Sequence, residues 1–182
     1  FSMPLLSSRR VYTGRVVSLD VDTVRFPNGN EGELEMLRHP GAAAVVPFLD
    51  DPDQADPRIL LIRQFRHATD GWLWEIPAGR REGDEPPLET ARRELREETG
   101  RTAERIEPLI PFWTTPGFTD ERIHLFWAAG LAEGTTAHER DEVLEIHEVR
   151  FSEALEMIHN GTLDDAKTVI ALLLADRRRR IA

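Results

Sequence analysis

A run of charged residues between Gly79 and Arg101 constrains this chain more than any other segment. Within it, Glu94, Glu97 and Glu98 are spaced i, i+3 and i+4, which places three carboxylates on one side of a helix. Like charges this close repel one another by a few tenths of a kcal/mol per exposed pair. A cluster of hard oxygen ligands is what Mg²⁺ or Mn²⁺ needs. The segment therefore predicts a helix that binds a divalent cation, Mg²⁺ first and Mn²⁺ as an alternative.

The apolar residues of the same segment predict the same helix. Leu88, Ala91 and Leu95 form one narrow stripe at about 100° per residue, so this stripe is expected to be buried. Asp84 is a candidate N-cap, and Gly100 has the character of a residue that ends a helix. We therefore expect a helix with an acidic edge, a buried stripe and a mixed-charge edge.

The whole segment fits the pattern G-x5-E-x7-R-E-U-x-E-E-x-G-U, where U is a bulky apolar residue. This pattern resembles the signature of the Nudix hydrolases, with one departure at Arg101, where an apolar residue is usual. An acidic run by itself would more often be a solvated helix face, but matches at eight of nine defined positions favour the resemblance. Glu85 is expected to pair with an arginine and to order the loop, not to bind metal.

The resemblance implies a fold and a reaction class. The expected fold is α+β, an α/β/α sandwich with a mixed β-sheet, and the resemblance covers roughly residues 40–175. The expected reaction is hydrolysis of a diphosphate that joins a nucleoside to a second group. The resemblance also implies that the metal ligands are the carbonyl oxygen of Ala78 and the carboxylates of Glu94, Glu97 and Glu98.

The general base is expected outside the signature. In the subfamily discussed below it resembles a glutamate in the loop before the last strand, and that loop contains Glu139 and Glu142 here. Glu142 ranks ahead of Glu139, Glu121 is a third candidate, and a signature glutamate such as Glu97 is a further alternative.

Three further segments resemble the ADP-ribose pyrophosphatases among the Nudix hydrolases. They are residues 62–66 (IRQFR), 74–79 (WEIPAG) and 115–121 (TPGFTDE), the last with threonine where the subfamily shows serine. The expected substrate is ADP-ribose or a related nucleoside diphosphate sugar, and the products from ADP-ribose are AMP and ribose 5-phosphate. The implied substrate-binding residues are Arg63, Arg66, Glu75, Pro116, Gly117 and Glu121.

The two arginines cannot both serve one diphosphate directly. Arg63 and Arg66 lie three residues apart on an expected strand, so they point to opposite faces. At most one of them can point straight at a given diphosphate, and the other is free to pair with an acid.

Three alternatives stay open. The chain could act on another substrate, such as GDP-mannose or a dinucleotide, because base recognition can rest on backbone groups. It could also be a catalytically silent nucleotide sensor, although all three signature glutamates are present. Decapping of RNA is disfavoured, since the net charge is −10 and no basic patch is evident.

The chain is expected to divide into residues 1–40, an N-terminal strand extension, and residues 41–182, the catalytic domain. Residues 10–26 and 31–39 read as two strands of a hairpin around the turn at 27–30. The resemblance implies a homodimer that exchanges these N-terminal strands. The remaining expected elements are strands at 42–49, 58–65, 72–76, 106–113, 122–129 and 143–151, a helix that is capped by Ser152 and ends at Asn160, and a helix at 164–178.

Composition excludes several classes of protein. The chain has no cysteine, which rules out disulfides and thiolate catalysis. No apolar run approaches the roughly 20 residues of a membrane span, and no signal peptide is evident. We therefore expect a cytoplasmic enzyme with a small-molecule substrate and no membrane or nucleic-acid partner.

Overall fold

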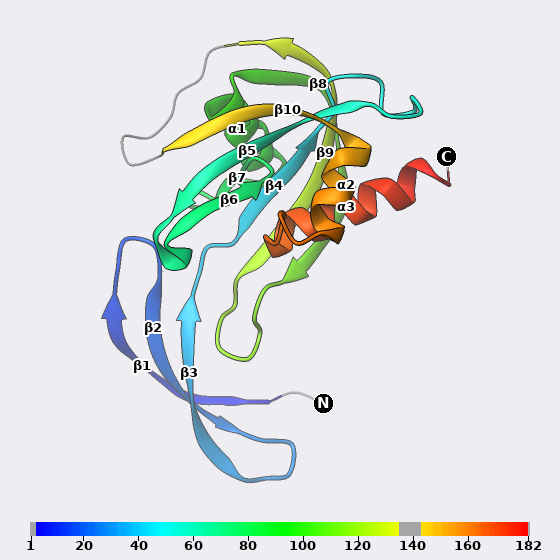
Figure 1. The fold of residues 1–182 in the computed structure, drawn as a ribbon. Helices are drawn as coiled ribbons and strands as arrows, with labels where there is room; N and C mark the ends of the chain where they lie inside the picture. The colour runs from blue at the N-terminus through cyan, green and yellow to red at the C-terminus, as the bar shows by residue number, and fades with distance from the viewer. Residues whose placement is uncertain (1–2, 135–142, 182) are drawn as a thin grey trace. The chain divides into compact units, whose positions relative to one another are not determined.

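The computed structural model describes residues 3–134 and 143–181 of the chain. These residues form two compact units (Figure 1). The first contains the N-terminal residues up to Gly41 together with Phe112–Ile123. The second contains Ala42–Pro111 and the residues from His124 onward.

The first unit is built on a three-stranded antiparallel sheet in the order β1-β2-β3. Its strands are β1 (Leu5–Thr13), β2 (Ser18–Arg25) and β3 (Glu31–Arg38). The predicted pairing of β2 with β3 is confirmed. The prediction of one continuous strand over residues 10–26 was wrong, because the chain reverses at Gly14, whose N–H donates to the carbonyl of Val17 at 2.9 Å. A Cβ at Gly14 would lie 2.9 Å from that carbonyl oxygen, so glycine permits the tight turn.

The second unit contains two sheets. One has the strand order β7-β4-β9-β8 and the other has the order β10-β5-β6. Between them they contain seven strands, β4 (Ala42–Pro47), β5 (Arg58–Arg66), β6 (Gly71–Glu75), β7 (Ala78–Arg80), β8 (Arg101–Trp113), β9 (Arg122–Glu133) and β10 (Leu144–Arg150). A short 3-10 turn, His67–Thr69, joins β5 to β6.

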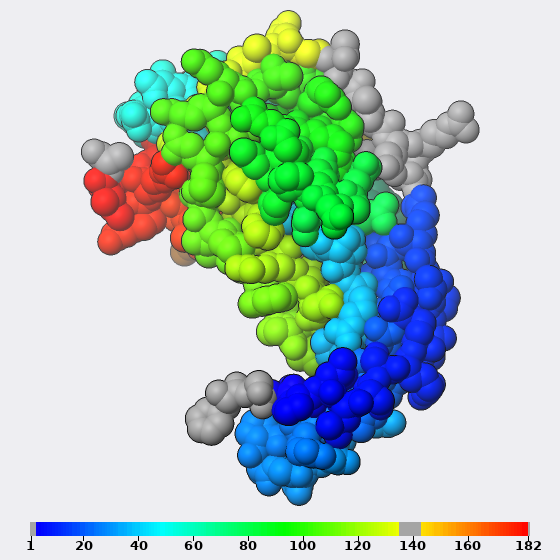
Figure 2. All heavy atoms as spheres, turned by 180° about the vertical axis from the view of Figure 1, so that it is seen from behind, coloured from blue at the N-terminus to red at the C-terminus, as the bar shows by residue number. Residues whose placement is uncertain are grey.

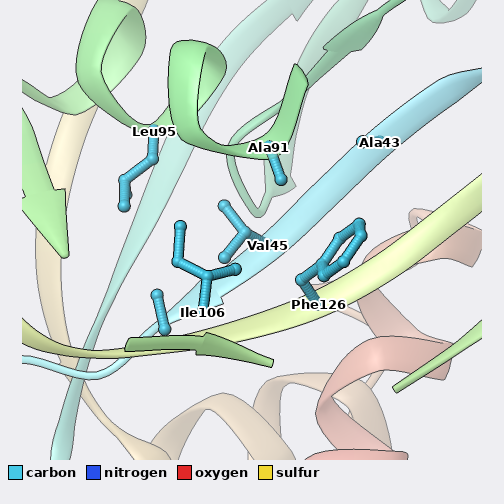
Figure 3. Close-up of a cluster of buried hydrophobic side chains, with 7 residues drawn as sticks. Ala43, Val45, Ala91, Leu95, Ile106 and Phe126 are labelled. Carbon is cyan, nitrogen blue, oxygen red and sulfur yellow. The ribbon is translucent and has the colours of Figure 1, made fainter. Parts of the chain in front are cut away.

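Helices cover both faces of the β7-β4-β9-β8 sheet. Helix α1 (Pro87–Thr99) places Ala91 and Leu95 on Val45 of β4 and Phe126 of β9, and all four side chains are buried (Figure 3). The predicted apolar stripe is therefore confirmed.

The C-terminal helices are α2 (Phe151–His159) and α3 (Ala166–Arg179). Phe48, just after β4, stacks on Phe151 of α2 at 5.4 Å between ring centroids and meets Trp127 edge-on. Figure 3 shows the C-terminal helices on the side of the strands opposite α1. The predicted α+β sandwich is confirmed, because strand alternation supplies apolar residues to both faces.

Two predicted helix caps were wrong. Helix α1 begins at Pro87 with Pro86 at the cap position, so Asp84 does not cap it. Helix α2 begins at Phe151, so Ser152 lies inside its first turn, where its N–H and hydroxyl group donate to Asp56. Pro86 takes the cap position of α1. At the start of α2 the carboxylate of Asp56, which is distant in the sequence, replaces a local side-chain cap.

Other helix ends agree with the sequence. Gly100 has φ 66° and donates its N–H to the carbonyl of Arg96, as expected at the end of α1. At the end of α3, Arg179 donates to the carbonyl groups of Pro52 and Gln54, and Figure 2 shows this helix (red) beside the segment after residue 50 (cyan).

No helix of the described residues is long and apolar enough to cross a membrane.

Candidate active site

The signature glutamates of α1 lie against the short strand β7. Glu94 is only 8% exposed, and its carboxylate covers the Cα atom of Gly79. A Cβ at Gly79 would lie 1.9 Å from Glu94 Oε1, which is far inside any allowed contact. Glycine is therefore required at position 79 to let this carboxylate approach the backbone.

Glu98 lies one helical turn further along α1 and is 1% exposed. Its Oε2 atom accepts a hydrogen bond from the N–H of Ala78 at 2.9 Å. Glu94 and Glu98 thus contact consecutive residues of β7. A buried carboxylate is costly unless it is hydrogen-bonded or paired, and for Glu98 the N–H of Ala78 provides such a hydrogen bond.

Arg93 binds three carboxylates at once. Its Nη1 atom lies 2.6 Å from Glu94 Oε1 and 3.2 Å from Glu97 Oε2. Its Nε and Nη2 atoms donate to Glu85 at 3.1 and 3.0 Å. Burial alone would lower the pKa of Arg93, but the hydrogen bonds that it donates to Glu85 and the charge of Glu94 outweigh burial and raise it. One guanidinium group therefore offsets the repulsion among the acids of this helix.

The predicted brace at Glu85 is confirmed. Besides Arg93, Glu85 accepts a hydrogen bond from the hydroxyl group of Thr90 at 2.8 Å. The Arg93 hydrogen bond is the main cause that lowers the pKa of Glu85 to about 2. The loop before α1 is thus attached to the helix through an ionised carboxylate.

The carboxylate oxygens of Glu94, Glu97 and Glu98 are suitable ligands for a divalent cation, although the three side chains are not gathered around one point. In residues 3–134 and 143–181, no three His, Asp or Glu side chains form a group that could hold a metal ion. Instead Glu94 and Glu97 share the Nη1 atom of Arg93, and Glu98 contacts Ala78. Glutamate oxygens around a turn without a side chain at Gly79 are nevertheless hard ligands of the kind that Mg²⁺ prefers.

A second buried cluster joins β5, β6 and α3. Glu75 is 1% exposed, and Arg66 donates to both of its oxygens, from Nε at 2.7 Å and from Nη2 at 2.8 Å. The Nζ atom of Lys167 also bonds to Glu75 Oε2. Burial would raise the pKa of Glu75, but the hydrogen bond of Arg66 and the charge of Lys167 outweigh burial, and the pKa is lowered.

Sequence reasoning gave Lys167 no role in the site. The signal that could have found it is composition, because Lys167 is the only lysine among 23 basic residues. A chain that otherwise uses arginine throughout places its one ammonium group on a buried carboxylate.

Arg63 lies apart from this cluster. It pairs across the sheet with Trp74 in the register of β5 and β6, and its guanidinium group stacks on Trp72 and Trp74 at 5.4 and 5.9 Å. Arg66 points to the other face, toward Glu75. The prediction that the two arginines face opposite ways is confirmed.

The remaining predicted substrate residues belong to the first unit. Pro116 is exposed, and a Cβ at Gly117 would meet no atom within 4 Å, so the backbone there is open. The loop adjoins β3, because the N–H of Leu37 donates to the carbonyl of Phe118 at 2.8 Å. Glu121 Oε1 lies 3.4 Å from His39 Nδ1.

Two of the candidate general bases have no described geometry. Glu139 and Glu142 fall in residues 135–142, outside the described part of the chain. Arg101, the one departure from the signature, begins β8 and lies 3.2 Å from Glu133, which replaces the usual apolar contact with an ion pair.

Comparisons of the sequence with known proteins point to one family. The NUDIX domain model matches residues 38–172. A methanol dehydrogenase activator from Bacillus methanolicus is 41% identical over 94% of this chain and 91% of its own length. An ADP-ribose pyrophosphatase from Bacillus subtilis (strain 168) is 37% identical over 92% of this chain and 89% of its own length.

A solved structure shows the same fold. The crystal structure of an ADP compounds hydrolase superposes with a TM-score of 0.84, covering 99% of this chain and 95% of that chain at 20% identity. The signature helix, the glycine of β7 that its glutamate covers and the matched domain agree, and the chain belongs to the NUDIX hydrolase family.

Proposed function

We propose that this chain is a metal-dependent pyrophosphatase that hydrolyses ADP-ribose to AMP and ribose 5-phosphate. One observation carries the proposal: Glu94 and Glu98 lie against residues Ala78 and Gly79 of β7, and the approach of Glu94 requires glycine at position 79. NUDIX hydrolases generally use divalent metal ions. The similarity to the Bacillus subtilis ADP-ribose pyrophosphatase over 92% of the chain supports the substrate.

We assign the metal site to the Ala78 carbonyl oxygen and the carboxylates of Glu94, Glu97 and Glu98, with Mg²⁺ as the ion and Mn²⁺ as the alternative. When bound, such an ion neutralises phosphate charge and makes a coordinated water more acidic. The protein's own contribution is to hold these carboxylates in place. Arg93 orients Glu94 and Glu97 through hydrogen bonds, and the N–H of Ala78 orients Glu98 in the same way.

Arg66 is our candidate for binding the diphosphate. Its Nε and Nη2 atoms are occupied by Glu75, and within the described residues its Nη1 atom has no hydrogen bond. The side chain is 40% exposed, so an anion can reach this atom. Glu75 is buried with both oxygens occupied, and we therefore assign it to holding Arg66 and not to contacting a ribose.

The other substrate contacts are assigned by the family resemblance. Gly117 suits close approach of a ligand, because the space around its Cα is open. Pro116 and Glu121 flank it in the same loop. Arg63 stacks on two tryptophans, and we give it no contact with the diphosphate.

The general base is proposed to be Glu142, with Glu139 as the second choice. Either carboxylate would take the proton of the attacking water. Glu142→Gln and Glu139→Gln, assayed separately, decide between them: the variant of the base loses turnover and keeps substrate affinity.

Residues 1–40 are proposed to be a dimerisation element attached to a catalytic domain of residues 41–182. The support is strand β1, in which all nine residues are exposed, including Leu5 and Tyr12. Such an edge strand offers unpaired backbone groups and apolar side chains to a second copy. A monomeric mass in light scattering at micromolar concentration would overturn the dimer. We place the enzyme in the cytoplasm, and the net charge of −10 argues against a nucleic-acid partner.

A panel assay tests the proposed reaction. ADP-ribose, GDP-mannose, NADH, diadenosine polyphosphate and a nucleoside triphosphate are each incubated with Mg²⁺ and with EDTA. The expected result is fastest hydrolysis of ADP-ribose and loss of activity in EDTA. Activity that persists in EDTA would contradict the metal-dependent mechanism, and preference for a triphosphate would contradict the substrate assignment.

A matched pair of variants tests the ligand set. Glu98→Gln is expected to lower kcat about 100-fold and to change KM by no more than about threefold. The control is Glu89→Gln on the same helix, because Glu89 is exposed and lies 3.7 Å from its nearest cation, Arg92. Glu98→Gln activity within a few-fold of wild type would show that the ligand assignment is wrong.

A second candidate function follows from one relative. The Bacillus methanolicus protein, 41% identical over 94% of this chain, is named for activation of a methanol dehydrogenase. The test is the rate of methanol oxidation by a purified methanol dehydrogenase with and without this chain. No change in that rate would leave the pyrophosphatase as the only proposed function.

A further inference from the structure

The single lysine of the chain occupies a position that the proposed reaction does not yet use. Lys167 lies in the first turn of α3, and its side chain is only 13% exposed. Its Nζ atom bonds to Glu75 Oε2 and lies 3.0 Å from Asp165 Oδ2. An ammonium group is strongly hydrated, so its burial requires carboxylate partners such as these.

Charge balance links Lys167 to Arg66. Two cations, Arg66 and Lys167, face two carboxylates, Glu75 and Asp165, in this cluster. Arg66 also feels the charges of Glu98 and Asp165, which add to the hydrogen bond of Glu75 in raising the pKa of Arg66. If Lys167 were neutral, Arg66 alone would compensate these acids. Its guanidinium group would then be drawn further toward them and away from any incoming phosphate.

A neighbouring contact has a different and purely structural role. Asp165 caps α3 by accepting a hydrogen bond from the N–H of Thr168 at 3.0 Å. The hydroxyl group of Thr168 in turn accepts a hydrogen bond from the N–H of Ile76 at 3.0 Å. Ile76 leads into β7, so this pair attaches α3 to the active-site strand. The hydroxyl group of Thr168 also donates to Asp165 Oδ2 at 2.6 Å, the oxygen that Lys167 contacts, but of these two residues only Lys167 brings a charge to the cluster.

We propose that Lys167 is a positioning residue for substrate binding. Its ammonium group balances Glu75 and Asp165 and thereby leaves the Nη1 atom of Arg66 available to the substrate diphosphate. The inference rests on the proposed function, since it takes the Arg66 contact with a diphosphate as its starting point.

The test compares three variants with wild type. The dissociation constant of ADP-ribose is measured by calorimetry in EDTA, where hydrolysis stops, and KM and kcat are measured with Mg²⁺. Lys167→Met is expected to raise both the dissociation constant and KM about tenfold and to change kcat by less than about threefold, because a lost uniform binding interaction appears in KM. Lys167→Arg keeps the charge and is expected to recover most of the affinity. Thr168→Val is expected to lower the melting temperature and to leave the dissociation constant within about twofold of wild type.

A double variant keeps the proposal testable if Lys167→Met folds poorly. Glu75→Gln combined with Lys167→Met removes one charge of each sign, so the double variant is expected to fold better and bind ADP-ribose more tightly than Lys167→Met alone. Unchanged affinity in Lys167→Met, equal loss of affinity in Thr168→Val, or no recovery in both Lys167→Arg and the double variant would each overturn the proposal.

The same measurements distinguish failure of the proposed function from failure of the Lys167 proposal. That failure appears in wild type, as no binding and no hydrolysis of ADP-ribose, before any variant is compared. The variant series is then run with the panel substrate that wild type hydrolyses fastest, and the expected changes are the same for any diphosphate. Failure of the Lys167 proposal appears only in the variants.

Discussion

The carboxylate of Glu94 lies in the space that a side chain at Gly79 would fill, with 1.9 Å between Oε1 and the position of that Cβ. Gly79→Ala must therefore displace either the buried carboxylate or strand β7. We expect about a 100-fold loss of kcat, since small displacements of catalytic groups have effects of this size. Gly71→Ala is the control, because its Cβ would meet only the Thr69 carbonyl oxygen, at 3.6 Å. Equal activity in the two variants would show that this contact is unimportant.

Arg93 and Arg92 are neighbours on α1 with very different surroundings. Arg93 binds Glu85, Glu94 and Glu97 and is 19% exposed, whereas Arg92 lies 3.7 Å from exposed Glu89. Arg93→Ala leaves partly buried carboxylates without their cation, and we expect a loss of about 3 kcal/mol in the free energy of unfolding.

The control, Arg92→Ala, is expected to cost less than about 0.5 kcal/mol, because exposed ion pairs contribute little. Urea denaturation of both variants measures the difference. Similar losses in the two would show that Arg93 acts as an ordinary surface residue.

Glu85 predicts a pH dependence of stability. Its pKa in the folded protein is lowered from 4.5 to about 2, mainly by Arg93. The contribution of Glu85 is therefore complete above pH 4.5 and is lost as the pH falls from 4.5 toward 2. Glu85→Gln is expected to have a lower melting temperature than wild type at neutral pH, and this gap should narrow in the acid range. A difference in melting temperature between wild type and Glu85→Gln that stays constant down to about pH 2.5 would contradict the lowered pKa of Glu85.

Leu95 and Leu173 test the packing of the helices. Leu95 is fully buried between α1 and the sheet, whereas Leu173 on α3 is 51% exposed. Leu95→Ala is expected to lower the free energy of unfolding by about 2–5 kcal/mol. Leu173→Ala is expected to stay within about 0.5 kcal/mol of wild type. Thermal or urea denaturation measures both, and a large loss in Leu173→Ala would indicate an unrecognised buried contact.

Local patterns predicted much of the fold because they depend on residues close in the chain. The stripe of Leu88, Ala91 and Leu95 predicted α1 from its spacing alone, and Gly100 marked its end. The wrong prediction at Ser152 concerns competition between local and distant partners. Ser152 was expected to cap a helix, but its hydroxyl group donates to Asp56, 96 residues away along the chain.

The family, the signature helix and the acids that a metal would need could all be predicted from the amino-acid sequence, since they follow from spacing along one helix. Folding determines how those acids are held: Arg93 joins Glu85, Glu94 and Glu97, and Glu98 reaches Ala78. It also decided that Glu75 is buried between Arg66 and Lys167, residues about 100 positions apart. The physical reason is that helix and strand periodicity is local, whereas the pairing of a buried charge depends on which distant side chain folding brings within hydrogen-bond distance.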